Sequence, residues 1–348
     1  MIEPLVAIQG GRGTFSEYAA MSLVPEGIVV PQKEPRHLFD AIDKGEADFA
    51  VIPIENVYSG SAFIYYDLLL QYAAFSRGNR RIRIIKEATI NIRHNLVSHP
   101  QARLKDLTEI CSHPNALAQC ANYIKRNRFS PKEASDTAVF LDDIRKAFTL
   151  PAAEQERLLR TAVIASVQAA HDYGMRVLDR DIHDRSKNYT RFLLLAPITS
   201  PLVEKELGTQ VKISIAFIVD NDEGTLFKAL SAFGSRAINV VRLETRPIHG
   251  TNTEWYKFEK GEWDLIYFVD FEGNARDCLN ALDHLAQLVQ ETDGDKALSF
   301  LGLYRPAHDE NGKTIVDEEG SGKLWGAMRR TSHRKRASTS EIRNEEIR

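Results

Sequence analysis

LVAIQGGRGTFSEYAA, residues 5–20, joins an apolar run to a glycine cluster and then to the start of a helix. Thr14 and Glu17 have the spacing of a capping box, with Thr14 as the N-cap and Glu17 at the third helical position. The free N–H groups and partial positive charge of a helix N-terminus suit a small anion. The stretch matches neither common phosphate loop, because Ser16 replaces the third glycine of the dinucleotide motif and Gly-Lys-Ser/Thr is absent. Two interpretations remain: an anion site, or a tight strand-to-helix turn without a ligand.

Residues 4–200 alternate short apolar runs with helical patterns. The runs are rich in Val, Ile and Ala, which is typical of buried strands. Helical stretches lie between them, such as Asn115–Arg126 and Glu34–Lys44, which ends at Gly45. Such alternation indicates parallel sheets covered by helices. The elements are too many for one small sheet, so we expect an α/β region of two lobes with a cleft between them. The expected strands are residues 5–9, 27–30, 48–54, 88–92, 109–112, 161–166 and 190–196.

The pattern changes after residue 200. A Ser-Pro step and a charged run predict a linker at residues 201–210. Residues 211–305 then have the order strand, helix, strand, strand, helix, strand, which is the ferredoxin-like arrangement. Residues 306–348 are polar and nearly free of large apolar side chains, so we expect disorder. The basic cluster in this tail is open to three interpretations: a localisation signal, a phosphorylation site at Ser332 or Ser338, or a solvated segment.

Composition excludes several classes of protein. A formal charge of −3 over 348 residues argues against non-specific nucleic-acid binding. Three cysteines without a CxxC pair argue against a disulfide framework or a zinc site. No apolar run reaches the ~18 residues of a membrane span, and residues 1–30 lack the layout of a secretory signal. We therefore expect a cytoplasmic protein with no membrane, nucleic-acid or metal partner.

Two more polar loops follow expected strands. Glu55 and Asn56 come directly after the expected strand 48–54. Ser112 and His113 stand at the end of the expected strand 109–112. Ligands of parallel α/β sheets bind at the carboxyl ends of the strands, so these side chains are candidates for a binding site. Each loop is also typical of an ordinary turn. For His113 the sequence leaves open an acid, a hydrogen-bond donor and a helix cap.

A fourth polar pair opens the last strand of this region. The side chains of Thr190 and Arg191 are expected to point to opposite faces of the sheet. Arg191 has the geometry of a carboxylate clamp, although an ordinary ion pair on the sheet is the alternative. Metal-ligand spacing and a serine nucleophile elbow are both absent from the sequence. Four polar loops at strand ends together indicate an anion-binding cleft, which serves either a cofactor-free reaction on a small polyanion or simple binding.

Six motifs stand in an order that resembles prephenate dehydratase followed by a C-terminal ACT regulatory domain. The resemblance covers roughly residues 4–305, and arogenate dehydratase is a close relative of this family. The motifs are GGRGTFSE (10–17), PIENVYSG (53–60), SHPNALAQC (112–120), NYTRF (188–192), EGTLFKAL (223–230) and ETRP (244–247).

The resemblance implies a domain plan and partners. Residues 1–200 would form a two-lobed catalytic domain similar to type II periplasmic solute-binding proteins, 201–210 a linker, 211–305 an ACT domain and 306–348 a disordered basic tail. Segment 248–263 is longer than the hairpin of the ACT fold needs. ACT domains of this family bind L-phenylalanine as a feedback inhibitor and pair side by side, which implies a homodimer or homotetramer.

The resemblance also implies an activity and its residues. Enzymes of the family remove carbon dioxide and hydroxide from prephenate, without a cofactor, and release phenylpyruvate. Thr190 matches the catalytic threonine, which assists the departing hydroxide. The residues implied in substrate binding are Thr14, Phe15, Ser16, Glu55, Asn56, Gly60, Ser112, His113, Gln119, Arg191 and Phe192. Those implied in phenylalanine binding are Gly224, Thr225, Leu226, Asn239, Glu244, Thr245, Arg246 and Pro247.

The chain departs from the family pattern at several positions. Val57 stands where the family usually has serine, so a hydroxyl is missing unless Ser59 or Ser61 replaces it. Arg12 adds a positive charge to the first loop, and Thr245 replaces a serine while keeping the hydroxyl. Two alternatives to prephenate dehydratase stay open: an arogenate dehydratase, and a catalytically inactive homologue that senses an amino acid.

Overall fold

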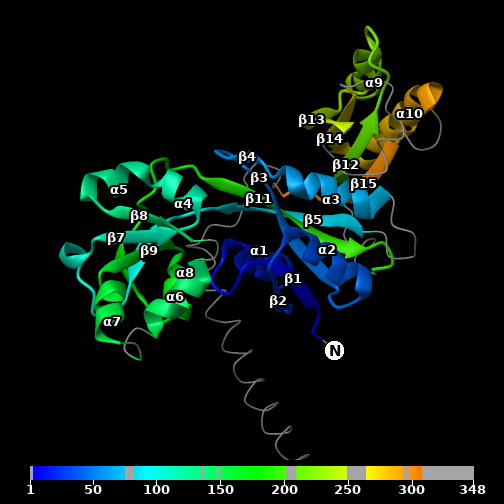
Figure 1. The fold of residues 1–348 in the computed structure, drawn as a ribbon. Helices are drawn as coiled ribbons and strands as arrows, with labels where there is room; N and C mark the ends of the chain where they lie inside the picture. Colours follow the sequence, from blue (N-terminus) through cyan, green and yellow to red (C-terminus); the bar gives the residue numbers. More distant parts are fainter. Residues whose placement is uncertain are drawn as a thin grey trace, which may run out of the picture.

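The computed structural model divides the chain into two α/β lobes and a C-terminal βαββαβ unit (Figure 1). The expected linker up to residue 208, the segment 249–263 and the tail from residue 308 lie outside the described residues. No helix in the described part of the chain is long and apolar enough to cross a membrane. The described residues are 3–74, 82–134, 137–146, 149, 151–200, 209–248, 264–293 and 298–307.

The first lobe (residues 5–91 and 189–197) contains a sheet in the order β2-β1-β3-β11-β5. β1 pairs in parallel with β2 and β3, whereas β11 runs antiparallel to β3 and β5. The expectation of parallel sheets is therefore met by β1, β2 and β3 but not by β11, which re-enters this lobe from the second one and runs antiparallel. β11 lies between β3 and β5 in this sheet. The bounds are β1 Leu5–Gln9, β2 Ile28–Gln32, β3 Phe49–Asn56, β4 Gly60–Ser61, which pairs with β3, β5 Ile82–Asn91 and β11 Tyr189–Pro197.

Helices cover both faces of this sheet. α1 (Phe15–Leu23) packs on one face, while α2 (Pro35–Lys44) and α3 (Phe63–Ala74) pack on the other. α2 ends at Gly45, whose φ of +73° favours glycine, as its position after the helical pattern predicted.

β5 begins six residues before the expected run at 88–92. The sequence of this strand hides it, because Arg83 and Glu87 interrupt its apolar alternation. Both side chains are nevertheless buried and have polar partners: Arg83 Nη1 donates to the carbonyl of Ala73 over 2.9 Å, and Glu87 pairs with two cations described below. A hydrophobicity pattern does not show that a charged side chain will be buried beside a polar partner, so it misses the first part of this strand.

The second lobe (residues 95–179) has a five-stranded sheet in the order β10-β6-β9-β7-β8. Helices again lie on both faces, and the chain crosses between the lobes twice, through 92–94 and 180–188. Arg93 of the first crossover forms a bidentate pair with Asp181 of the second, at 2.8 and 2.7 Å. The strands are β6 Asn95–Ser98, β7 Glu109–Ser112, β8 Ser130–Glu133, β9 Thr161–Ala165 and β10 Arg176–Asp179. The helices are η1 Leu104–Asp106, α4 Pro114–Gln119, α5 Ala121–Asn127, α6 Thr137–Arg145, α7 Ala152–Leu159 and α8 Val167–Asp172.

The single helix expected over Asn115–Arg126 is divided at Cys120. Asp184 from the second crossover forms hydrogen bonds with both sides of the break. Its N–H donates to the carbonyl of Gln119 over 2.8 Å, and its carboxylate accepts from the N–H of Asn122 at the start of α5. A residue distant in sequence thus caps both helix ends.

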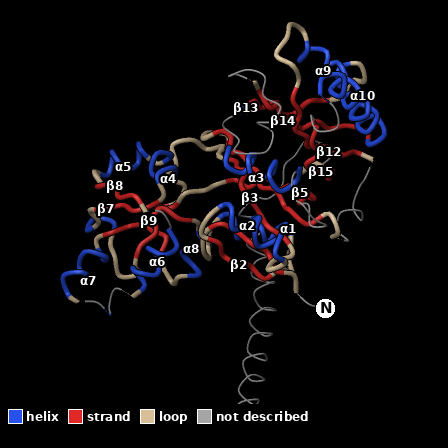
Figure 2. The backbone as a smooth tube through the Cα atoms, turned by 45° about the vertical axis from the view of Figure 1, so that its right-hand side comes forward, coloured by secondary structure: helices blue, strands red, loops and turns tan. Residues whose placement is uncertain are grey.

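The C-terminal unit (residues 210–304) has the predicted ferredoxin-like order of elements, with an antiparallel sheet β13-β14-β12-β15. α9 and α10 cover the face of this sheet that is turned away from the first lobe (Figures 1 and 2). The elements are β12 Gln210–Ile218, α9 Thr225–Gly234, β13 Asn239–Pro247, β14 Leu265–Asn274, α10 Ala275–Asp293 and β15 Leu298–Tyr304.

The other face of the C-terminal sheet packs on the first lobe. Tyr66 of α3 and Phe268 of β14 share one apolar core, with ring centroids 4.9 Å apart. β15 also pairs with β5 at Gly302 and Ile84, which joins the two sheets into one. A Cβ at Gly302 would lie 2.4 Å from the Ile84 carbonyl oxygen, so only glycine fits this contact.

Candidate functional site

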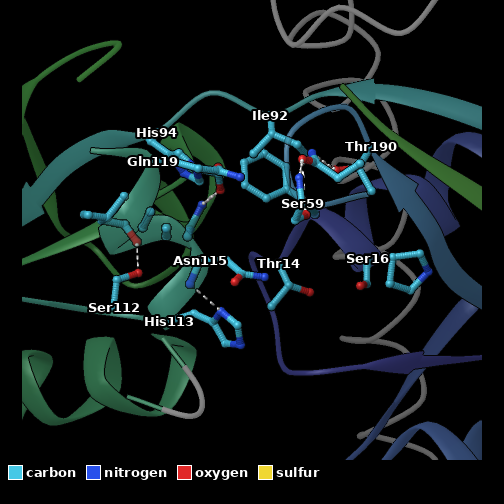
Figure 3. Close-up of a pocket in the computed structure, with 18 of the residues that line it drawn as sticks. Thr14, Ser16, Ser59, Ile92, His94, Ser112, His113, Asn115, Gln119 and Thr190 are labelled. Carbon is cyan, nitrogen blue, oxygen red and sulfur yellow. Dashed lines mark hydrogen bonds between the residues drawn. The ribbon is translucent and has the colours of Figure 1, made fainter. Parts of the chain in front are cut away.

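A cleft of about 450 Å³ lies between the two lobes (Figure 3). Of the residues expected to contact substrate, every one except Arg191 lines it, so the structure brings together loops from four separate parts of the chain. The expected residues in the cleft are Thr14, Phe15, Ser16, Glu55, Asn56, Gly60, Ser112, His113, Gln119, Thr190 and Phe192.

The opening loop forms the predicted cap and also touches the second lobe. Thr14 Oγ1 accepts from the N–H of Glu17 at 3.3 Å, and the Glu17 carboxylate accepts from the N–H of Gly13 at 2.6 Å. Ser166, which precedes α8, donates to the carbonyl of Gly13 over 2.9 Å. Gly13 has a φ of +79°, and a Cβ there would lie 2.6 Å from Cα of Ala169. Glycine is therefore required both by the turn and by the contact between lobes.

Thr190 meets Asn56 at the ends of β11 and β3. Asn56 Oδ1 accepts from the N–H groups of Tyr58 and Ser59, at 2.9 and 3.1 Å, which fixes the orientation of the amide because backbone N–H groups only donate. Asn56 Nδ2 is then the donor to Thr190 Oγ1 at 2.9 Å, and the Tyr189 carbonyl oxygen is a further acceptor at 3.0 Å. Since the oxygen of Thr190 accepts this bond, its own hydrogen is left to be donated elsewhere, and Thr190 lines the cleft.

The orientation of the Asn56 amide also fixes the orientations of the Asn188 and Gln119 amides, and Gln119 belongs to the second lobe. Asn56 Nδ2 also donates to Asn188 Oδ1, and Asn188 Nδ2 donates to Gln119 Oε1, both at 2.8 Å. The Gln119 oxygen lies 2.7 Å from His94 Nε2, which must therefore carry a hydrogen. Burial lowers the pKa of His94 to about 4, so the ring is neutral at physiological pH.

The loop after β7 uses its polar groups locally. Ser112 Oγ donates to the carbonyl of Ile164 over 3.0 Å, and His113 Nδ1 accepts from the N–H of Asn115 at 3.2 Å. His113 is thus a helix cap, which was one of its three interpretations. Both residues still line the cleft, together with Asn115.

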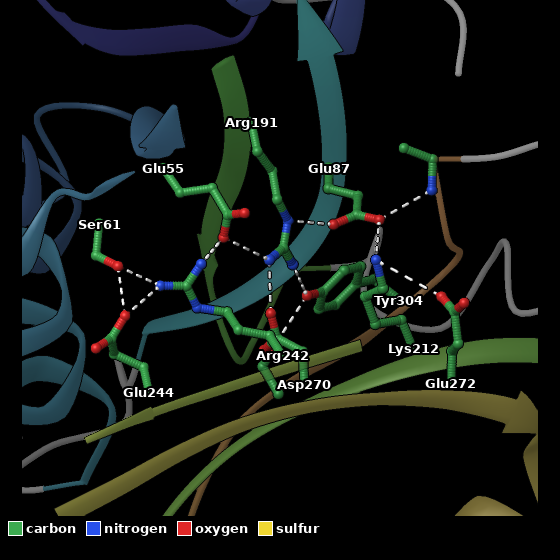
Figure 4. A network of polar contacts seen from close by, with 12 residues as sticks. Glu55, Ser61, Glu87, Arg191, Lys212, Arg242, Glu244, Asp270, Glu272 and Tyr304 are labelled. Atoms are coloured by element: carbon green, nitrogen blue, oxygen red, sulfur yellow. Dashed lines mark hydrogen bonds and ion pairs between the residues drawn. The ribbon is translucent and has the colours of Figure 1, made fainter. Parts of the chain in front are cut away.

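Arg191 is not in the cleft, so the expectation that it clamps a carboxylate there is wrong. Strand alternation directs Thr190 to the cleft and Arg191 to the opposite face, which the C-terminal unit covers (Figure 4). Its guanidinium donates to Glu87, Asp270 and Tyr304, at 2.7, 2.6 and 2.8 Å. The alternative interpretation, an ion pair on the sheet, is the one observed.

Glu87 lies at the centre of this buried cluster. Besides Arg191, it accepts from Lys212 Nζ at 2.7 Å and from the N–H of Ala307 at 2.9 Å. Burial alone raises the pKa of Glu87, but Arg191 and Lys212 together hold it below its ordinary value. The carboxylate is therefore ionised at neutral pH and binds the two parts of the chain together.

The residues assigned to phenylalanine lie in two groups. Gly224, with a φ of +79°, precedes α9, and Thr225 Oγ1 donates to the carbonyl of Asp220 over 2.6 Å. On β13, by contrast, Glu244 and Arg246 are engaged by the first lobe of the same chain: Ser61 Oγ donates to Glu244 at 2.5 Å, and Arg246 pairs with Asp67 at 2.8 Å. The remaining residues assigned to this site are Leu226 and, on β13, Asn239, Thr245 and Pro247.

Some cleft residues carried no signal in the sequence. His94 was missed because it stands in a crossover without any motif, whereas Ser166 could have been found by the strand-end rule that identified Ser112. Val57 is 59% exposed and does not line the cleft, while Ser59 and Ser61 both do. Within the described residues no group of three or more His, Cys, Asp or Glu side chains is placed to hold a metal ion.

Comparison with known proteins agrees with this geometry. The family model for prephenate dehydratase matches residues 6–199. Arogenate dehydratase 2 of Petunia hybrida is 36% identical over 293 residues, which cover 82% of this chain and 68% of that protein. Prephenate dehydratase of Methanocaldococcus jannaschii is 32% identical over 238 residues, 68% of this chain and 75% of that one. The solved prephenate dehydratase of Arthrobacter aurescens in complex with L-Phe has a TM-score of 0.69 at 25% identity, and the match covers 97% of this chain and 99% of that one. The chain belongs to the prephenate dehydratase family.

Proposed function

We propose that the protein converts prephenate to phenylpyruvate, with loss of carbon dioxide and of the ring hydroxyl as water. When the bond between the ring and its carboxylate breaks, the electron pair of that bond moves into the ring and forms a double bond. The hydroxide leaves the ring in the same process and takes up a proton to form water. Aromatisation supplies the driving force, so the protein must orient a dicarboxylate and assist the departing oxygen. Family membership supports this reaction class.

The orientation of the Thr190 hydroxyl carries the proposal. Because Thr190 Oγ1 accepts from Asn56, its hydrogen is free to be donated to the leaving hydroxyl of a substrate in the cleft. A donor that is already oriented stabilises the developing charge without reorganisation. Assistance of this kind typically contributes ~10²–10⁴ in rate.

The cleft also offers distinct environments for two carboxylates. Arg12, Thr14 and Ser16 line it near the start of α1, and we assign them to the side-chain carboxylate, which is kept. Phe15, Ile92 and Phe192 give other parts of the lining an apolar character. A carboxylate that is about to leave should not be held tightly, since strong ground-state binding would slow its loss.

We further propose that residues 1–200 form the catalytic domain and 211–305 an ACT domain that binds L-phenylalanine and pairs into a homodimer or homotetramer. The L-Phe in the Arthrobacter structure supports the effector. In this chain Glu244 and Arg246 bind the first lobe, so an effector site that uses them has to compete with Ser61 and Asp67.

Arogenate dehydratase is the second candidate, favoured by the 36% identity to the Petunia enzyme. A turnover assay on the purified chain separates the two: each substrate is offered alone, and phenylpyruvate and phenylalanine are quantified, with and without added L-phenylalanine. Turnover of prephenate that Thr190→Val lowers at least 10²-fold supports the proposal. Turnover of neither substrate would refute it in favour of the sensing homologue.

A further inference from the structure

Glu55 is unusual among the side chains of the cleft. Of the described residues that line it, Glu55 alone carries a carboxylate. Its side chain is 36% exposed, and the carboxylate lies where the lining of the cleft meets the buried ionic cluster around Arg191. An ionised carboxylate there would repel the two carboxylates of prephenate unless a cation neutralises it.

The neutralising cation comes from the C-terminal unit. Arg242 on β13 contacts Glu55 Oε2 through Nη1 (Figure 4). Its other terminal nitrogen donates to Ser61 at 2.6 Å and pairs with Glu244 at 3.0 Å. The guanidinium also lies over the Tyr66 ring, 5.0 Å from its centroid, and only 13% of the side chain is exposed. Arg242 is therefore held in one place by four contacts.

No other cation in the described cluster serves Glu55 as well. Arg191 is the next nearest, but its Nη1 is 3.7 Å from Glu55 Oε2 and lies 2.6 Å from Asp270. The rest of its guanidinium is committed to Glu87 and Tyr304. Removal of Arg242 would leave Glu55 with a weak share of a cation already bound to stronger partners.

Prephenate and arogenate differ in the group that such a charge would sense. Both carry two carboxylates, but arogenate has an ammonium where prephenate has a keto oxygen. A neutralised Glu55 is nearly indifferent to this exchange, whereas an unpaired Glu55 attracts the ammonium and repels the dianion. The charge state of one cleft carboxylate therefore changes the ratio of the two activities.

We propose that Arg242 is a specificity-determining positioning residue, supplied by the C-terminal unit, which neutralises Glu55 and so favours the keto acid over its amino analogue. The inference rests on the proposed function. It also gives the C-terminal unit a part in substrate selection that does not depend on any effector.

The experiment compares kcat/KM for prephenate and arogenate in the full chain and its variants. In Arg242→Gln the ratio of arogenate to prephenate kcat/KM should rise roughly tenfold, the size expected for one unit charge acting at close range in a half-exposed site. Arg242→Lys, which keeps the charge, should lie near the wild type. In the double variant with Glu55→Gln the ratio should return toward the wild-type value, because the carboxylate that Arg242 neutralises is then absent as well.

Asp67→Asn is the matched control. It removes the ion pair between Asp67 and Arg246, a second cation of β13 that also reaches the first lobe and lies over an aromatic ring, that of Phe63. Neither partner lines the cleft, so the ratio should not change. A merely structural role for Arg242 would lower both activities together and leave the ratio constant.

Three results would overturn the inference: an unchanged ratio in Arg242→Gln, an equal change in Asp67→Asn, or a tenfold fall of the ratio in Glu55→Gln alone, which would mean that Glu55 was never neutralised. The last variant also decides the matter if Arg242→Gln does not fold. An unmoved ratio in an active protein refutes only this inference, whereas a wild type that turns over neither substrate refutes the proposed function and this inference with it.

Discussion

The side-chain amide of Asn56 donates a 2.9 Å hydrogen bond to Oγ1 of Thr190, across a register pair that joins the last residue of β3 to the second residue of β11. Two backbone N–H groups on Asn56 Oδ1 prevent the amide from turning over. The threonine hydrogen is thereby directed away from Asn56.

Asn56→Asp keeps the shape of the side chain but replaces the donor by an acceptor. Thr190 would then donate to the new carboxylate, and the leaving hydroxyl would lose its donor. We expect kcat to fall by about 10²-fold or more with a smaller change in KM, measured by steady-state kinetics. Because both changes remove one donor, Asn56→Asp combined with Thr190→Val should lose no more than Thr190→Val alone. Losses that multiply would contradict a shared role.

Gly13→Ala tests the contact between the lobes. The new Cβ would collide with Ala169, and the φ of +79° is strained for alanine. We expect a loss of about 1–3 kcal/mol in the free energy of unfolding and a lower kcat/KM, because the lobes are pushed apart. Gly174→Ala is the control, since Gly174 has a φ of +66° with no atom within 4 Å of the added Cβ. It should cost stability without changing kcat/KM, and an equal loss of kcat/KM in both variants would exclude a steric effect at the lobe contact.

His94 makes stability depend on pH. Its folded-state pKa of about 4 lies below the ordinary value of 6.5, so the unfolded chain binds more protons between these values and stability is lost as the pH falls through that window. Urea unfolding at pH 7.5 and pH 5 should show a loss of about 2 kcal/mol from this residue alone. His94→Gln should remove that part of the loss, whereas His37→Gln, at an exposed position, should leave it in place. The same pH dependence in wild type and His94→Gln would show that His94 is not the cause.

Arg191→Gln should destabilise the protein strongly. The substitution removes the cation that pairs with Glu87 and Asp270, at a site where only 12% of the Arg191 side chain is exposed. Removing one member of a buried ionic cluster typically costs about 3–5 kcal/mol in the free energy of unfolding. Chemical unfolding measures the change. Arg145→Gln, which breaks the exposed pair with Asp142, should cost at most about 0.5 kcal/mol. A similarly small loss in Arg191→Gln would mean that the cluster does not hold the C-terminal unit to the first lobe.

The features predicted correctly depend on neighbours in the sequence. The cap of Thr14 on Glu17 and the glycine end of α2 at Gly45 involve residues within one helical turn, so the chain itself specifies them. The ferredoxin-like order followed from the periodicity of successive segments. The polar loops of the cleft were found because a strand end is a local feature, and parallel strands such as β1 and β3 bring such ends to one edge.

The sequence by itself determined which side chains alternate, and so that Thr190 and Arg191 face opposite ways. Only the tertiary structure decided what each of them meets. Arg191 finds Glu87 and Asp270, 104 and 79 residues away, and this placed it in the interface and not in the cleft. The break at Cys120 and the pairing of Glu55 with Arg242 have the same origin. Local periodicity sets the direction of a side chain, whereas its partner depends on which distant segment packs against it. The reason is that burying an unpaired charge is costly, so a charged side chain is buried only where the fold places an opposite charge beside it.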